Sequence, residues 1–351
     1  MNTYDGVDRE LVDLMQSVFA AHRSSRHEAP GAIGMDLKLW RTLESLGLTR
    51  LTGAEKNNGS GATWREAATL LNAAAGHAAS LPLAEHDVLA GWLLELAGLP
   101  ADDAVRTACI LDEAGTAHAV PWAREAAQIV VLWNADDGWM VADIPTSEVA
   151  IVAGHNVAGE TRDTVTADLT TLHGAAVSSR TADEFFLRGA LARTLQTCGA
   201  METVLRLCVS HTTERVQFGR TLSKFQAVQN LVADIAAELS LAKSAASAAV
   251  VEVATSGWGS ETLAFAIATA KSCAGHAASV VVRNAHQIHG AIGTTFEHEL
   301  HEFTKRVLAW RSEFGGVHHW EALLTKAALD AGHDGCWTLV SKGGVLPAPG
   351  A

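Results

Sequence analysis

The feature that most constrains the fold is a series of long helical segments in the second half of the chain. From Asp183 to about Arg215 the apolar residues follow helical spacing, with no proline and only two interior glycines, Gly189 and Gly199. The same periodicity predicts three more helices, at 224–256, 261–290 and 297–331, the last with a break at Gly315-Gly316. Alanine is frequent in the second and third, and small residues let helices approach closely. Four helices of this length predict an antiparallel bundle.

The first half of the chain predicts shorter elements of two kinds. Helical patterns cover residues 8–21, 37–46, 63–76 and 84–97, and Gly47 is a typical helix stop. Short apolar runs at 129–133, 139–144 and 148–152 predict strands, with a hairpin turn at 136–138. The predicted fold is therefore mainly α with a small β domain. We place an N-terminal helical domain at 1–107, a middle β domain at 108–178, a four-helix-bundle domain at 179–333 and a tail at 334–351.

Composition excludes several classes of function. The 351 residues carry a formal net charge of −13, which argues against broad nucleic-acid binding because a phosphate backbone requires a basic surface. No apolar run reaches the roughly 20 residues of a membrane span, and no signal peptide is visible, so we expect a cytoplasmic protein. The five cysteines are an odd number without a CxxC pair. We therefore expect neither a disulfide framework nor a metal site.

Two segments combine residue types that bind ligands. Residues 215–226, R-x-x-F-G-x-x-L-x-x-F-Q, lie between two predicted helices and combine arginines, a glycine and a following helix N-terminus, which together can hold a phosphate. Residues 287–293, Q-x-x-G-x-x-G, place two glycines where a helix should continue, at a cost of about 1 kcal/mol each. Taken singly, each segment is a weak signal, because an arginine in a loop between helices is more often a solvated surface charge than a phosphate ligand.

In this order and separation, the two segments resemble the C-terminal signatures of the acyl-CoA dehydrogenase family. Residues 39–48 are similar to that family's N-terminal helix followed by glycine, and the resemblance covers residues 5–330. It implies a three-domain flavoprotein that uses FAD and an acyl-CoA substrate. In this family a proton leaves the substrate Cα while a hydride passes from Cβ to the flavin.

The resemblance also implies cofactor contacts and partners. Arg215 and Gln217 would contact the FAD pyrophosphate with Phe225 and Gln226 alongside, and Gln287, His289, Gly290 and Ala291 would line the adenosine portion. In the family these segments reach into the flavin site of a neighbouring subunit, so an oligomer is implied, usually a tetramer. The implied electron acceptor is an electron-transfer flavoprotein.

The sequence departs from the family where the chemistry is done. A thioester α-proton requires a carboxylate base, and the two usual positions for it hold Phe314 and Gly189, with Glu313 one residue away from the first. The family's Thr-Glu-Pro-x-x-Gly-Ser flavin loop is replaced by residues 111–122. Gly316 and His318 stand where Thr and Gln usually contact the flavin.

Three functions are compatible with this pattern. The first is the subunit lacking the catalytic Glu in a heteromeric acyl-CoA dehydrogenase, as in the actinobacterial enzymes of steroid side-chain degradation, paired in a heterotetramer with a Glu-bearing paralogue. The second is a homotetrameric dehydrogenase whose displaced base is Glu313. The third is a non-redox binding or scaffold protein of the same fold. All belong to lipid metabolism or derive from it, and the acyl chain stays open.

Overall fold

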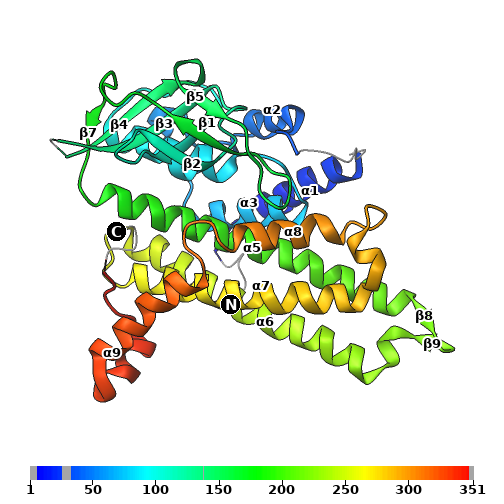
Figure 1. The fold of residues 1–351 in the computed structure, drawn as a ribbon. Coiled ribbons are helices and arrows are strands. Elements are labelled where there is room, and N and C mark those ends of the chain that lie inside the picture. Colours follow the sequence, from blue (N-terminus) through cyan, green and yellow to red (C-terminus); the bar gives the residue numbers. More distant parts are fainter. Residues whose placement is uncertain (1–5, 26–32, 137, 348–351) are drawn as a thin grey trace. The chain divides into compact units, whose positions relative to one another are not determined.

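The computed structural model describes residues 6–25, 33–136 and 138–347 (Figure 1). These residues form two compact units. The first unit contains residues 6–25, 68–79 and 190–347, and the second contains 33–67 and 80–189. The boundaries expected at 107 and 178 lie beside the first strand, which begins at Arg106, and just before the helix that begins at Thr181.

The first unit is a helical bundle. Its elements are α1 (Arg9–Ser25), the end of α3 (Trp64–Gly76), most of α5 (Thr181–Glu214), α6 (Gln226–Ser256), α7 (Leu263–His289), α8 (Leu300–Trp310) and α9 (Val317–Lys342). Helix α7 packs along α6 and also contacts α8 and α9 (Figure 1). Alanines such as Ala242, Ala249, Ala270 and Ala277 are fully buried, which lets these helices approach closely. The predicted long helices and the small-residue packing are confirmed.

One interior glycine of α5 marks a close contact between helices. A Cβ built on Gly199 would lie 2.3 Å from the backbone oxygen of Asn72 in α3. Only a residue without a side chain fits there, which explains why a helix otherwise made of good helix formers accepts a glycine.

The last predicted helix differs from its sequence-based bounds. The chain breaks between α8 and α9, where Gly315 and Gly316 were expected to interrupt it. Helix α9 then continues past Ala331, the expected end, to Lys342 and so into the expected tail. Gly332 has the non-helical angles φ +65° and ψ −175°, so the first helical stretch of α9 stops at the expected Ala331 and a second stretch continues to Lys342. A glycine in this conformation commonly closes a helix, and what periodicity did not predict is the second stretch beyond it.

Helix α7 bears on the expectation that the chain has no membrane span. The segment Leu263–Thr294 is long enough to cross a membrane and contains an 18-residue window with a mean hydropathy of 1.3. In the structure 56% of that window is buried inside the protein, against α6 and α9. We conclude that its apolar character serves the bundle core.

The second unit contains two small sheets. The four-stranded sheet has the order β1 (Arg106–Ile110), β3 (Gln128–Ala135), β4 (Gly138–Pro145) and β7 (Ala175–Ala176), with β1 and β3 parallel. The three-stranded sheet has the order β2 (Thr116–Pro121), β6 (Arg162–Thr166) and β5 (Ala150–Val152). Their apolar faces share a core that includes Ile129, Val131, Trp133 and Val165. The three predicted strands are confirmed within a few residues, and Asp137 of the expected turn lies outside the described residues.

The helical part of this unit holds an unusual element. This unit contains the short helices α2 (Leu37–Ser45), η1 (Glu55–Asn57), α4 (Trp92–Ala97) and η3 (Thr146–Glu148). Directly before α4 lies η2 (Ala84–Gly91), a π-helix at a position where the sequence predicts an α-helix.

All eight residues of η2 are buried, including three polar ones. The Asp87 carboxylate accepts hydrogen bonds from Thr52, and His86 Nδ1 accepts one from the Arg106 amide. Burial raises the pKa of Asp87 to about 6 and lowers that of His86 to about 3. The wider π turn places these side chains beside Thr52 and Arg106, and the 3.6-residue periodicity of an α-helix does not predict these contacts.

Candidate active-site segments at one end of the bundle

Both motif segments lie at the same end of the helical bundle. Helix α5 ends at Glu214 and leads into the hairpin of β8 (Val216–Gln217) and β9 (Arg220–Thr221), which projects from the bundle (Figure 1). Helix α7 ends at His289. The His289 ring stacks on the ring of His211, which lies in the last turn of α5, and the two ring centroids are 4.4 Å apart. The fold thus brings together two segments that are distant in sequence.

The hairpin tip has a strained conformation. Its two-residue loop, Phe218-Gly219, has φ +52° and φ +78°, the signature of a type I′ turn. Asn or Gly usually fills the first of these positions, because a bulky side chain is disfavoured at positive φ. Phe218 is also 92% exposed. A strained and exposed aromatic side chain indicates a functional role for the tip.

The expected cofactor residues of the hairpin differ in exposure. Arg215, Gln217 and Gln226 are exposed. Phe225 is half-buried: the Arg220 guanidinium lies over its ring at 4.1 Å, and the Phe218 ring centroid is 6.2 Å away. The hairpin therefore presents hydrogen-bond donors to the exterior above a small aromatic base.

The second segment combines exposed and buried residues. Gln287, Gly290 and Ala291 are exposed. Gly290 ends α7 with φ +65°, and the short helix η5 (Gly290–Thr294) follows. Among the described residues, apart from its chain neighbours, no heavy atom lies within 4 Å of a Cβ built on Gly290. His289, expected beside them, is buried and faces inward. Six of the eight expected cofactor residues are thus exposed, with Phe225 half-buried and His289 buried.

His289 belongs to a cluster of three histidines. His211 from α5 and His298 from the α7–α8 connection each offer a ring nitrogen, and the three nitrogens lie within 4.8 Å of one another. Burial lowers the pKa of His211, and burial lowers that of His289 to about 4, so both rings are neutral at neutral pH. Spacing along the sequence could pair His298 only with His301, so this cluster was not predicted.

Glu313, the candidate base, is held in an ion pair. It lies in the turn between α8 and α9, where its Oε2 accepts a hydrogen bond from Arg193 Nε at 2.6 Å. Arg193 is buried, and Lys271 Nζ donates to the Glu313 backbone oxygen at 2.7 Å. Phe314, which the resemblance places at the position of the base, has φ +52°. A carboxylate bound to a buried guanidinium is poorly suited to taking a proton from a substrate.

Residues 111–122, which we expect in place of the family's flavin loop, contain a turn closed by hydrogen bonds within the loop. Asp112 Oδ1 accepts hydrogen bonds from the amides of Ala114 and Thr116, both at 2.9 Å. A hollow of about 940 Å³ opens beside it, and its charged lining residues are Asp112, Glu113 and Asp136. Three carboxylates would repel a phosphate group brought into this hollow.

Comparisons with known proteins agree with this architecture. Residues 179–316 match the family model of the acyl-CoA dehydrogenase C-terminal domain. The chain is 27% identical over 314 residues to the acyl-CoA dehydrogenase IpdE2 of Mycolicibacterium smegmatis, covering 85% of this chain and 90% of that protein.

Solved structures share the fold. A chain of the ChsE4-ChsE5 complex from Mycobacterium tuberculosis superposes with a TM-score of 0.78 at 20% identity, covering 94% of this chain and 98% of that one. A variant of the Tcur3481-Tcur3483 steroid ACAD superposes with a TM-score of 0.79 at 21% identity, covering 92% and 97%. The match over residues 179–316 identifies this part of the chain as the C-terminal domain of an acyl-CoA dehydrogenase family member, and the solved structures show that the rest of the chain shares their fold.

Proposed function

We propose that this chain is the subunit lacking the catalytic base in a heteromeric FAD-dependent acyl-CoA dehydrogenase. It lends its hairpin and its Q-x-x-G-x-x-G segment to a flavin held by a partner subunit, and the partner supplies the glutamate. The observation that carries the proposal is the contrast between Phe218, strained and 92% exposed, and Glu313, bound to the buried Arg193. The hairpin that would be lent to the partner is exposed, whereas the Glu313 carboxylate is held in an ion pair.

The exposed residues fit the part of FAD assigned to them. A pyrophosphate carries two negative charges and accepts hydrogen bonds, and the Arg215 guanidinium with the Gln217 amide supplies matching donors. The open space around Gly290 admits a close approach of the adenosine. When bound, FAD supplies the hydride acceptor, while this chain's residues bind and orient its distal half.

The chain's own flavin half fits poorly. The loop at 111–122 bonds to itself beside an acidic hollow, and the positions of the family's base hold Phe314 and Gly189. The names of the two solved relatives describe complexes of two different chains, one of them a steroid enzyme. They support a heteromeric enzyme that acts on an acyl-CoA such as a steroid thioester. From the family resemblance we further propose a cytoplasmic heterotetramer with an electron-transfer flavoprotein as acceptor.

The first experiment counts flavin per polypeptide from the visible absorption spectrum. The chain is purified alone and with a co-expressed glutamate-bearing acyl-CoA dehydrogenase. We expect a colourless protein alone and a yellow complex with the partner. Arg215→Gln should weaken FAD binding in the complex by about tenfold to a hundredfold, because it removes a charge-assisted hydrogen bond. Arg41→Gln, an exposed arginine on α2, is the matched control and should change nothing.

Two results contradict the proposal in different ways. A yellow chain that turns over acyl-CoA alone, and loses turnover in Glu313→Gln, would establish the homo-oligomeric dehydrogenase. A complex that assembles with the partner but holds no flavin would leave the scaffold function.

A further inference from the structure

We propose that His211, His289 and His298 form a binding site for a first-row transition-metal ion of the Zn²⁺ type. The three rings come from different elements: the last turn of α5, the end of α7 and the connection to α8. Their ligand nitrogens lie within 4.8 Å of one another. The centroid of the His289 ring is 4.4 Å from that of His211 and 4.7 Å from that of His298. The inference does not depend on flavin binding.

His289 has the arrangement of a metal-ligating histidine. It is only 6% exposed, and its Nδ1 donates to the Ala285 backbone oxygen at 2.9 Å. That bond fixes the tautomer and leaves the lone pair on Nε2, as the backbone-bonded histidines of metal sites do. Nε2 is fully buried and has no hydrogen-bond partner among the described residues. A buried acceptor without a partner indicates a missing ligand.

The other two histidines can move to complete the site. Metal–nitrogen bonds of 2.0–2.1 Å in a tetrahedral site place the nitrogens about 3.4 Å apart, so the cluster must contract. His211 and His298 are half-buried, so their rings are less tightly enclosed than that of the buried His289. His298 Nδ1 accepts a hydrogen bond from the Leu300 amide at 3.1 Å. Metal binding therefore requires His298 to give up that hydrogen bond. Either Nδ1 binds the metal in place of the amide, or Nδ1 takes the ring proton and Nε2 binds the metal.

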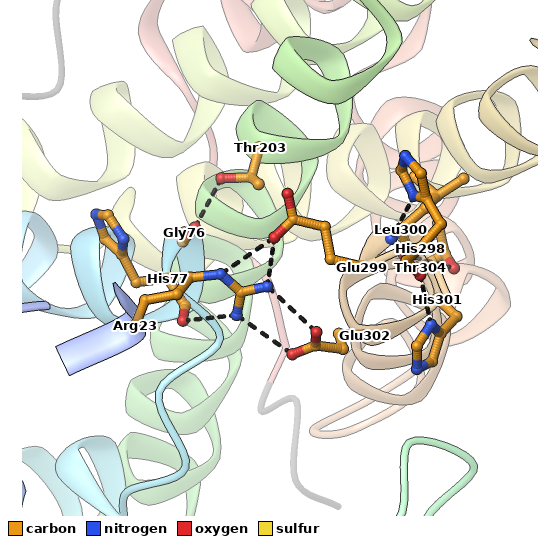
Figure 2. Close-up of polar contacts among 10 residues, drawn as sticks. All are labelled: Arg23, Gly76, His77, Thr203, His298, Glu299, Leu300, His301, Glu302 and Thr304. Carbon is orange, nitrogen blue, oxygen red and sulfur yellow. Dashed lines mark hydrogen bonds and ion pairs between the residues drawn. The ribbon is translucent and has the colours of Figure 1, made fainter. Parts of the chain in front are cut away.

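The composition of the site determines the class of ion. Imidazole nitrogens suit Zn²⁺, Cu²⁺, Ni²⁺ and Co²⁺, whereas Mg²⁺ and Ca²⁺ prefer oxygen. The neighbouring carboxylate of Glu299 is turned to Arg23, at 2.6 Å, as Figure 2 shows. Three nitrogen ligands leave the fourth position of a tetrahedral ion to water.

A metal here would join the bases of both motif segments. Arg215, four residues after His211, donates its amide to the His211 backbone oxygen at 3.0 Å. His289 immediately precedes the exposed Gly290. An ion bound to all three rings would fix the end of α5 relative to the end of α7, and hence the hairpin relative to the Q-x-x-G-x-x-G segment.

The test is a metal titration of the full chain, free of affinity tag, stripped with chelator and free of flavin. We expect one Co²⁺ per chain, seen by its visible d–d absorption and displaced by Zn²⁺. His211→Gln and His298→Gln should each weaken binding at least about tenfold. His333→Gln, an exposed histidine on α9, is the matched control and should bind like the unmodified chain. Circular dichroism checks that each variant is folded.

Two outcomes would overturn the site. One is a folded, unmodified chain that binds neither Co²⁺ nor Zn²⁺ at stoichiometric concentration. The other is a pair of folded variants, His211→Gln and His298→Gln, that bind as tightly as the control.

Discussion

Lys271 is a buried amine whose ionisation is coupled to folding. It is 4% exposed on α7, and burial lowers its pKa from 10.5 to about 7. Between these two values the unfolded chain binds a proton that the native chain does not. The free energy of unfolding therefore gains a contribution that rises with pH from about 7 to about 10.5 and is absent below that window.

Replacing Lys271 should change the pH dependence of stability. The Lys271→Met variant loses this contribution, so its free energy of unfolding should rise less steeply between pH 7 and 10, by up to about 1 kcal/mol per pH unit. Urea denaturation at several pH values measures the slope. Lys243→Met, which removes a partly exposed partner of Glu202, is the control and should keep the unmodified slope. Equal slopes for all three proteins would show that Lys271 is charged in the native state.

At the scale of elements, α1 is held to α8 by one arginine. Arg23 forms ion pairs with Glu299 at 2.6 Å and Glu302 at 3.2 Å, and its Nη1 donates to the His77 backbone oxygen at 3.3 Å (Figure 2). Glu302 is 8% exposed. Three segments of the bundle therefore meet at a single side chain, and its removal takes a cation away from the buried Glu302 carboxylate.

Arg23→Gln should destabilise the protein by about 2–3 kcal/mol, because breaking a buried ion pair is costly while glutamine keeps some of the hydrogen bonds. Lys326→Gln removes an exposed pair with Asp330 and should change stability by less than about 0.5 kcal/mol. Denaturant midpoints at constant pH compare the two. A loss no larger for Arg23→Gln than for Lys326→Gln would mean that the contacts in Figure 2 do not hold α1 in place.

The elements show how far the sequence alone predicts this fold. Long helices and central strands follow from periodicity, because one face of each is buried in a core, as Ile129 and Val131 illustrate. The π-helix at Ala84–Gly91 and the kink at Gly332 did not follow, since both depend on contacts or dihedral angles set by distant residues. Residues 215–226 could be predicted as a ligand-binding segment because their residue types lie next to one another in the sequence. The contact between His211 and His289 could not, because it joins residues that are distant in the sequence.

Across the whole molecule, the five cysteines differ in accessibility. Burial raises the pKa of Cys109, Cys198 and Cys208 to about 12, Cys273 is half-buried, and Cys336 on α9 is exposed. No disulfide joins them, as expected from the sequence. A thiol reacts as its thiolate, so reactivity should follow exposure.

A thiol reagent such as dithionitrobenzoate should label one cysteine per native chain rapidly, and all five after denaturation. Cys336→Ser should abolish the fast phase, and Cys208→Ser should leave it unchanged. Rapid labelling of several thiols in the native chain would contradict the packing of the bundle.

The residue at the tip of the hairpin lowers the stability of the chain but serves the proposed contact with a partner subunit. At φ +52°, Phe218 occupies a position where Asn or Gly would relieve backbone strain. A lineage that no longer lent this hairpin to any neighbouring subunit, whether a second copy or a different chain, would gain stability by that exchange. The aromatic residue at the tip is therefore an evolutionary marker: among relatives of this chain, its replacement by Asn or Gly should be an early sign of descent into an independent role.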